Sequence, residues 1–181
     1  IRASKKVGAA YLANLPKRLK LLDISAVNMD DRNLQYLPRQ IETLFLASSV
    51  DLANSYLHNL PANLIRLDLS KNTGITDGGI ASLPRTLTSL DLSANKQVTG
   101  ASVRQLPRTL TFLSLKSSKV WDDSCITHLP RSLTQLDLSS ASKLTVSCAN
   151  DFPPRLVLTI LHSDVRKWTK KHKVPGVPTK K

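Results

Sequence analysis

One eleven-residue phrase recurs along this chain and limits its possible folds more than any other feature. Residues 83–93 read LPRTLTSLDLS, a Leu-Pro pair followed by leucines at LxxLxL spacing. The pair recurs, with Phe152-Pro153 as its last version, at Leu15, Leu37, Leu60, Leu83, Leu106 and Leu129. Successive copies lie 22 residues apart once and 23 residues apart five times. This period predicts a solenoid of stacked coils, because one coil of this size cannot bury its own apolar face.

We number each coil from the first leucine of its LxxLxL run. These first positions are Leu19, Ile41, Leu64, Leu87, Leu110, Leu133 and Leu156. Successive side chains of a strand point to opposite faces, so the fourth and sixth positions enter the core and the third, fifth and seventh face outward. The sequence therefore predicts an α/β solenoid: a curved parallel sheet of seven strands with helical or irregular returns, in coils of 22–23 residues.

The return segments supply further predicted core residues. They are Ile75, Val98, Leu144, Ile80, Val103, Ile126 and the leucine of each Leu-Pro pair. The proline that follows each leucine lacks an N–H, which suits the end of a helical turn. Position nine holds Asn72, Asn95, Ser49 and Ser118, with Val27 and Ala141 as departures. We expect the asparagines to satisfy buried backbone groups of the turn.

The two ends of the chain differ from its middle. Counting back from Leu15 places Ile1 at position six, so we expect an eighth strand there and a natural protein that continues upstream. From residue 163 the chain is charged, bears proline and has no periodic apolar face. The predicted organisation is a solenoid over residues 1–162 and a basic tail over 163–181.

Composition excludes several classes of protein. Hydrophobic residues make up 41% of the 181 residues and aromatic residues only 4%, which indicates an aliphatic core. No apolar run approaches the roughly 18 residues that cross a bilayer, so we expect no membrane span. Two cysteines are too few for a disulfide framework. Cys125 and Cys148 share position sixteen of adjacent coils, where either packing of a small side chain or a disulfide is open.

No arrangement of residues in the sequence indicates catalysis. The four histidines show no metal spacing and no partnering nucleophile; they are His58, His128, His162 and His172. There is no phosphate-binding glycine loop or paired-carboxylate motif. We therefore expect no enzyme activity, no metal, no cofactor and no small-molecule substrate.

The outward face of the sheet is the first candidate binding surface. We expect it to bind protein through Asp23, Phe45, Asp68, Asp91, Phe112, Ser114 and Asp137. The aspartates have two possible interpretations. Either they recognise a basic partner or a metal, or they belong to the LDLS motif that is common in such strands. Phe45 and Phe112 are the stronger candidates, because aromatic side chains on a concave face are typical binding anchors.

A column of cations two residues before each strand is the second candidate surface. It contains Lys17, Arg39, Arg85, Arg108 and Arg131. The tail contributes Arg166, Lys167, Lys170, Lys171 and Lys173, and the whole chain, tail included, has a net charge of +13. Stacking turns the column into a stripe along one rim, either of solvated charges that cap carbonyls or of phosphate-contacting groups continuous with the tail.

The LxxLxL runs, and motifs such as Ile75-Thr76-Asp77-Gly78-Gly79-Ile80, resemble the leucine-rich-repeat superfamily over residues 1–162. The N-x-x-I-T-D-x-x-I pattern is similar to the cysteine-containing subclass found in F-box and related intracellular proteins. The coils here are shorter than in that subclass, and position nine holds Asn or Ser rather than Cys. The resemblance implies a curved binding scaffold without chemistry of its own.

These patterns favour a non-catalytic scaffold that binds a protein partner through its sheet face. The basic rim and tail further suggest a structural subunit of a large RNA-containing assembly, such as an organellar ribosome. The alternative is an F-box-type adaptor, or another leucine-rich-repeat interaction protein, whose effector domain lies upstream. We expect an intracellular location, with a mitochondrion or another organelle as one possibility.

Overall fold

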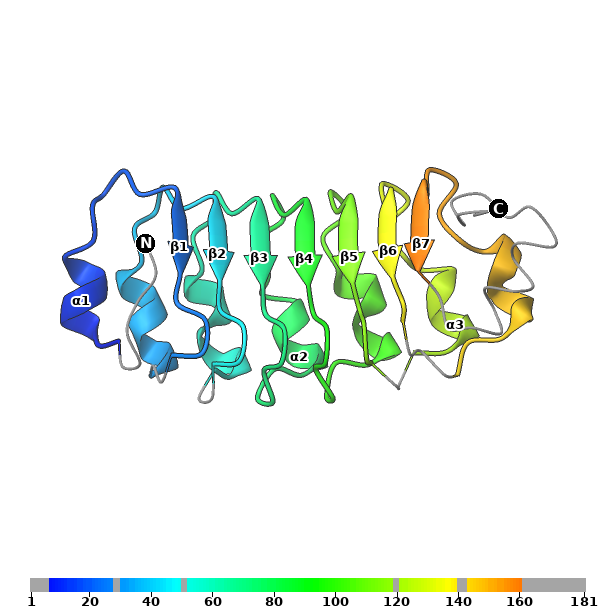
Figure 1. Cartoon of the computed structure of the whole chain (residues 1–181), viewed down its shortest axis with the longest axis horizontal. Coiled ribbons are helices and arrows are strands. Elements are labelled where there is room, and N and C mark those ends of the chain that lie inside the picture. The colour runs from blue at the N-terminus through cyan, green and yellow to red at the C-terminus, as the bar shows by residue number, and fades with distance from the viewer. Residues whose placement is uncertain (1–6, 28–29, 50–51, 119–120, 140–142, 161–181) are drawn as a thin grey trace.

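The computed structural model describes residues 7–27, 30–49, 52–118, 121–139 and 143–160, which form a row of stacked coils (Figure 1). Each coil contributes one strand to a single parallel sheet, and the strands follow one another in chain order. The strands are β1 (Leu21–Asp23), β2 (Thr43–Phe45), β3 (Arg66–Asp68), β4 (Ser89–Asp91), β5 (Phe112–Ser114), β6 (Gln135–Asp137) and β7 (Leu158–Ile160). The seven predicted strands are confirmed, while the expected eighth strand at Ile1 lies outside the described residues.

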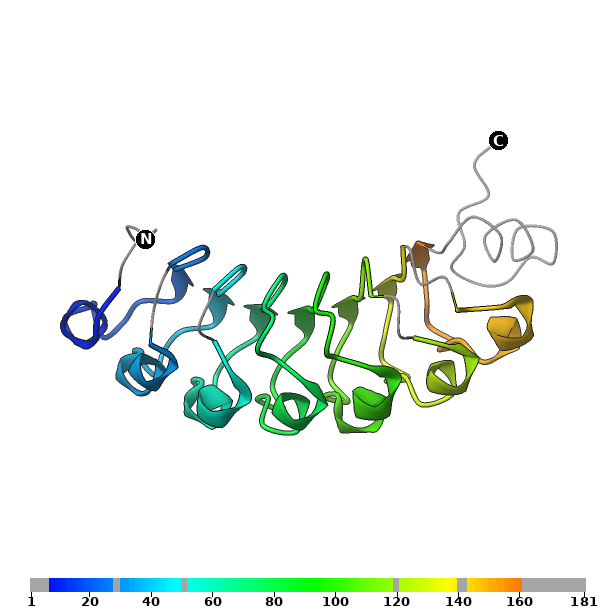
Figure 2. The same ribbon diagram turned by 90° about the horizontal axis from the view of Figure 1, so that it is seen from below.

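Short helical segments return the chain from each strand to the next. They are α1 (Ala9–Ala13), η1 (Asp31–Tyr36), η2 (Asn54–Asn59), α2 (Asp77–Ile80), η3 (Gly100–Gln105), α3 (Asp123–Ile126) and η4 (Val146–Asn150). In Figure 2 the coils follow a shallow arc, with the sheet along its inner side and the helical segments along its outer side. No helix of the described ranges is long and apolar enough to cross a membrane.

The leucines of the repeat form the core between sheet and returns. Register pairs Leu22, Leu44, Leu67, Leu90, Leu113 and Leu136 in sequence, each with its neighbour one coil away. These six side chains are all buried, at 2% exposure or less. The return residues predicted for the core are buried as well, from Ile75 and Ile80 to Leu144. Because each leucine contacts the coils on both sides, the core is continuous along the solenoid.

The Leu-Pro pairs end the helical segments and start the next strand. Leu37, Leu60 and Leu106 have extended backbone at ψ 136, 142 and 141, the conformation favoured for a residue before proline. The carbonyl of each of these prolines then accepts the N–H of the first-position residue three residues later, as from Leu87 to Pro84 at 3.3 Å. Proline thus sets the point where the return turns back into the sheet.

Position nine forms the asparagine ladder that the sequence predicts. Oδ1 of Asn72 accepts the backbone N–H of Ser49 at 2.8 Å, and Oδ1 of Asn95 accepts that of Asn72 at 3.0 Å. Nδ2 of Asn95 donates to the carbonyls of Leu69 at 2.9 Å and Leu92 at 3.0 Å. Each asparagine therefore joins two coils. The ladder stops at Ser118, whose hydroxyl is buried without a partner among the described residues.

The structure adds one core residue that the sequence analysis did not name, and it decides between the two alternatives for the cysteines. Trp121 occupies the position that Ile75 and Val98 occupy in earlier coils and is fully buried at 0% exposure. Cys125 and Cys148 are buried free thiols, so the disulfide alternative is wrong and the packing interpretation holds.

Candidate protein-binding face

The predicted face residues lie in two columns across the sheet. Register aligns the fifth-position column as Asp23, Phe45, Asp68, Asp91, Ser114, Asp137 and Ile160. Phe112 lies in the third-position column, between Ser89 and Gln135. Phe45 and Phe112 are half-buried, and Ser114 is only 5% exposed. Ser114 was expected among the outward contact residues, and its burial makes it a poor contact for a partner.

The face is hollowed between the two phenylalanines. A hollow of about 160 Å³ is lined by Phe45, Arg66, Leu67, Asp68, Ser89, Asp91 and Phe112. A second hollow of about 380 Å³ is lined by Ile65, Arg66, Thr88, Ser89, Phe112 and Gln135. Arg66, Ser89 and Phe112 line both hollows, so the two lie side by side on the face. We call the first hollow, between the two phenylalanines, the Phe45–Phe112 groove.

The aspartates of the fifth column have a structural role that the sequence analysis missed. Oδ1 of Asp68 accepts the N–H of Ser70 at 2.8 Å, and Oδ1 of Asp91 accepts the N–H of Ser93 at 2.7 Å. Asp23 and Asp137 make the same contact two residues on, at 3.0 and 2.8 Å. Such local side-chain bonds close a strand end and explain the recurrence of LDLS. They favour the structural interpretation of these aspartates. At Asp68 and Asp91 these bonds use only Oδ1.

Burial makes the centre of the groove electrostatically unusual. It raises the pKa of Asp91, and the neighbouring carboxylates of Asp68 and Asp137 raise it further, against the lowering effect of the Ser93 hydrogen bonds. Among the described residues, Oδ2 of Asp68 and Oδ2 of Asp91 form no hydrogen bond. Arg66, which lines the same groove, forms no ion pair with a described residue. The groove therefore holds two carboxylates and one guanidinium, a net charge of −1, without an ion pair between them.

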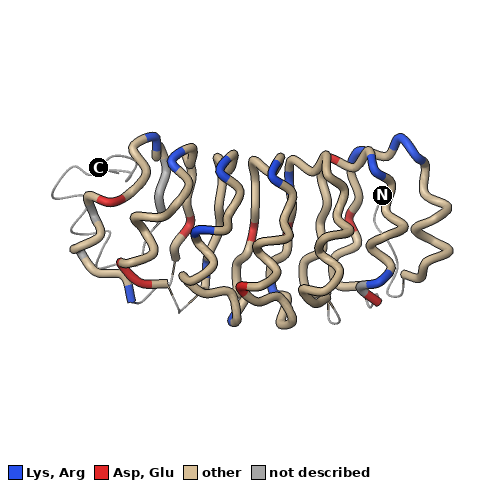
Figure 3. The backbone as a smooth tube through the Cα atoms, turned by 180° about the vertical axis from the view of Figure 1, so that it is seen from behind, with Lys and Arg blue, Asp and Glu red and all other residues tan. Residues whose placement is uncertain are grey.

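The predicted cation column lies along one long edge of the molecule, where Lys and Arg gather in Figure 3. All five of its members are exposed: Lys17, Arg39, Arg85, Arg108 and Arg131. Arg85 donates to the carbonyls of Gln105 at 2.7 Å and Ala81 at 3.3 Å. Arg108 repeats this pattern one coil later, with His128 at 2.9 Å and Arg104 at 3.1 Å. These arginines cap helical segments of two coils at once, which supports the carbonyl-capping interpretation of the rim.

The predicted cations of the tail lie outside the described residues. This applies to Arg166, Lys167, Lys170, Lys171 and Lys173, and to the boundary expected at residue 162. Their role in binding stays a prediction.

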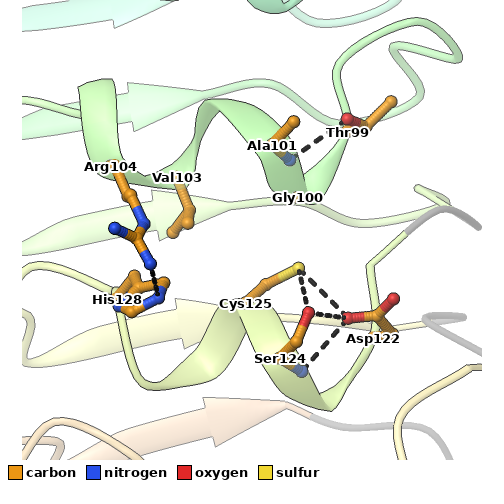
Figure 4. A pocket seen from close by; sticks show the side chains of 9 residues that line it. All are labelled: Thr99, Gly100, Ala101, Val103, Arg104, Asp122, Ser124, Cys125 and His128. Carbon is orange, nitrogen blue, oxygen red and sulfur yellow. Dashed lines mark hydrogen bonds between the residues drawn. The ribbon is translucent and has the colours of Figure 1, made fainter.

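A third hollow lies on the helical side of the solenoid, between η3 and α3 (Figure 4). Its volume is about 470 Å³, and its walls include Thr99, Arg104, Asp122, Cys125 and His128. Arg104 Nη2 donates to Nε2 of His128 at 2.6 Å, since a guanidinium has no acceptor atom. Asp122 caps α3 by accepting the N–H of Ser124 at 3.1 Å.

The thiols near this hollow are not activated. Burial raises the pKa of Cys125 and raises that of Cys148 to about 12, so both remain protonated near neutral pH. A nucleophilic cysteine requires the opposite shift. Within the described part of the chain, no three His, Cys, Asp or Glu side chains come together in a group that could hold a metal ion.

Several groove residues were not named by the sequence analysis. Arg66 and Ser89 hold position three of their coils, at the start of β3 and β4 and two residues before the predicted Asp68 and Asp91. The strand alternation already placed this position on the outward face. Strand alternation alone could not show that the face between Phe45 and Phe112 is hollow. The hollow depends on how the side chains of four strands pack.

Comparisons with known proteins agree on the fold. The family model described as Leucine Rich repeat matches residues 61–83 and 84–104, two consecutive coils. No curated protein sequence matches the chain. Among solved structures, an internalin of Listeria monocytogenes is similar with a TM-score of 0.66 and 21% identity, over 87% of this chain and 46% of that one.

Two further structures are complexes. TLR13 bound to ssRNA13 has a TM-score of 0.59 and 23% identity, over 84% of this chain and 23% of that one. Yeast Rad7 in complex with Elc1 has a TM-score of 0.53 and 20% identity, over 85% of this chain and 60% of that one. The chain spans less than two thirds of each of these three proteins. The family model thus matches two coils, and the coils on either side continue the same leucine-rich-repeat fold in register.

Proposed function

We propose that the chain is a non-catalytic scaffold that binds a protein partner through the Phe45–Phe112 groove. The groove is the observation that carries this proposal: two half-buried aromatic rings flank a hollow on the sheet face. A few well-packed anchor residues at the centre of an interface supply most of its binding energy. The complex of Rad7 with Elc1 supports the use of this fold for binding protein.

The test is co-purification of the full chain from its native cells, followed by identification of the proteins bound. In the variant Phe45→Ala/Phe112→Ala we expect binding to fall at least about tenfold. The matched control, Tyr11→Ala/Tyr36→Ala, removes two rings that are 41% and 44% exposed on the helical returns. Equal loss in both variants, or in neither, contradicts binding at the groove.

The exposed cation rim favours a second candidate, a structural subunit of an RNA-containing assembly such as an organellar ribosome. Its five cations fill the column in five of seven coils, with Ala62 and Pro154 as the exceptions, so successive cations lie one or two coil spacings of about 4.8 Å apart. The carbonyl contacts of Arg85 and Arg108 use only some of the five N–H donors of each guanidinium. The TLR13 complex supports the use of this fold for binding single-stranded RNA.

Salt dependence tests this second candidate. If about five phosphates are neutralised, log K for single-stranded RNA falls with log salt at a slope near −3.5, with little dependence on sequence. Arg85→Gln/Arg108→Gln/Arg131→Gln should lower both affinity and slope. The control Lys71→Gln/Lys96→Gln/Lys143→Gln removes three exposed cations that follow the strands rather than precede them. If both triple variants behave alike, the rim has no specific role.

An F-box-type adaptor remains the alternative for the whole protein. It requires a helical recruiting module upstream of Ile1, which the full-length sequence would reveal. The binding face would be the same in both cases, so the groove variants above apply to either.

A further inference from the structure

The sheet face has the opposite charge to the rest of the molecule. The whole chain has a net charge of +13. The outward third, fifth and seventh positions of β1 to β6 carry four aspartates against two cations, Arg66 and Lys116, for a net charge of −2. A local reversal of sign in a strongly basic protein creates a field that favours cations at this face.

The hollow at the centre of this face is sized for one side chain. At about 160 Å³ it is smaller than the roughly 300 Å³ at which sites for drug-sized molecules begin. Phe45 on β2 and Phe112 on β5 stand three strand spacings apart, about 14 Å. Asp68 on β3 and Asp91 on β4 lie between them, with Leu67 also lining the hollow.

The groups of the hollow match one particular kind of side chain. Two carboxylates offer unbonded Oδ2 atoms, and the two rings offer faces or edges to a flat cation. A guanidinium is planar, donates several hydrogen bonds in a fixed fork and stacks on aromatic rings. Lysine would satisfy the charge, but its compact ammonium stacks less well. Burial of Asp91, which raises its pKa, makes a cationic partner more favourable there.

We propose that the Phe45–Phe112 groove receives an arginine side chain from an extended basic segment of the protein partner. This inference rests on the proposed protein-binding function and specifies its chemistry. The arginine contacts Asp68 and Asp91 and stacks against Phe112 or Phe45, while the rest of the segment continues along the larger hollow beside Ile65 and Gln135.

The direct test is NMR titration of the full chain with a blocked tetra-arginine peptide. We expect amide shifts concentrated at residues 65–68, 89–93 and 112. Affinity should be several-fold lower for tetra-lysine, and tetra-glutamate should not bind. Asp68→Asn/Asp91→Asn keeps the Oδ1 acceptors of the strand ends and should weaken tetra-arginine binding about tenfold.

The matched control is Asp122→Asn/Asp151→Asn, which removes two negative charges away from the sheet face. It should bind tetra-arginine like the parent. Equal weakening in both double variants would mean that only net charge matters and would overturn the proposal. Shifts centred outside the groove, or tighter binding of tetra-lysine, would overturn it as well.

The basic tail of the chain is a competing occupant. In the full chain, Gln replacing Arg166, Lys167, Lys170, Lys171 and Lys173 should leave tetra-arginine affinity within about twofold. If affinity instead rises about tenfold or more, the tail fills the groove and the partner proposal is wrong.

The outcome can be separated from that of the proposed function. If Phe45→Ala/Phe112→Ala loses the co-purified partner while Asp68→Asn/Asp91→Asn retains it fully, the groove binds protein without an arginine. In that case only this inference fails. If both variants retain the partner, the proposed function fails too.

Discussion

The side chain of Cys125 occupies the space that a Cβ atom on Gly100 would need. Sγ of Cys125 points into this space, and its Cβ would lie 3.2 Å from the added atom. In the coils on either side, position fourteen holds Asp77 and Asp123, whose carboxylates bind Thr99 and Thr145 of the following coils. Gly100 lacks such a link to the next coil, and the cysteine fills the gap.

Gly100→Ala should therefore destabilise the protein by about 1–3 kcal/mol, the usual cost of overpacking. The measurement is urea unfolding followed by circular dichroism. Cys125→Ala removes the atom in conflict, so the double variant should recover most of the loss caused by Gly100→Ala. Additive effects of the two substitutions would show that the residues do not compete for space.

Ser118→Asn should stabilise the protein by about 1 kcal/mol by extending the asparagine ladder. By analogy with Asn95, the new Oδ1 would accept the N–H of Asn95 and the new Nδ2 would donate to the carbonyls of Leu92 and Leu115. It would also replace a buried hydroxyl that has no partner among the described residues. Thermal unfolding of Ser118→Asn and Ser118→Ala separates the new bonds from simple removal of the hydroxyl. A melting temperature of Ser118→Asn at or below that of Ser118→Ala contradicts the prediction.

Leu90→Ala should cost about 2–5 kcal/mol of unfolding free energy, because Leu90 is fully buried between the coils of β3 and β5. Hydrogen exchange should show protection lost in both neighbouring coils, since each coil is stabilised through its interfaces. Ser89→Ala, on the outward side of the same strand, should change stability by less than about 0.5 kcal/mol. A cost below about 1 kcal/mol for Leu90→Ala would argue against its place in the core.

Asp91→Asn should be at least as stable as the parent near pH 7 and should change the dependence of stability on pH. Burial raises the folded-state pKa of Asp91 above its ordinary value of 3.8. Protonation of Asp91 therefore stabilises the fold fully below about pH 3.8, and this contribution disappears as pH rises through the folded-state pKa. Urea unfolding of Asp91→Asn and the parent at several pH values from about 3 to 7 measures this contribution to the free energy of unfolding.

Asp122→Asn is a control for this titration, because the pKa shift of Asp122 has the opposite direction to that of Asp91. Hydrogen bonds from Ser124 and Cys125 lower the pKa of Asp122, so its contribution is present above its ordinary pKa and is lost as pH falls. Parallel pH profiles of the two variants would contradict the assigned directions.

The 23-residue period was sufficient to predict the sheet. Leu90 could be placed in the core, and Phe45 on the face, because stacking of identical coils converts sequence spacing directly into spatial neighbours. The ladder at Asn72 and Asn95 followed from the same alignment, since a buried amide in a repeated turn must bond to the backbone. The rim column of Arg85 and Arg108 was likewise located from spacing alone.

Other properties depend on contacts between coils whose residues differ. Position eight has left-handed backbone, as at Ala94 with φ 58, although no glycine or asparagine occupies this position to indicate it. The backbone N–H of Ala94 donates to the carbonyl of Lys116 in the next coil, and this hydrogen bond stabilises the conformation. The capping bonds of Arg85, the hollow between Phe45 and Phe112 and the fit of Cys125 against Gly100 likewise involve two or more coils. The sequence by itself determined which columns exist and which way they face, because that depends only on period and strand alternation. Only the tertiary structure decided which column members are buried, bonded or free, because that depends on the exact shapes of neighbouring side chains.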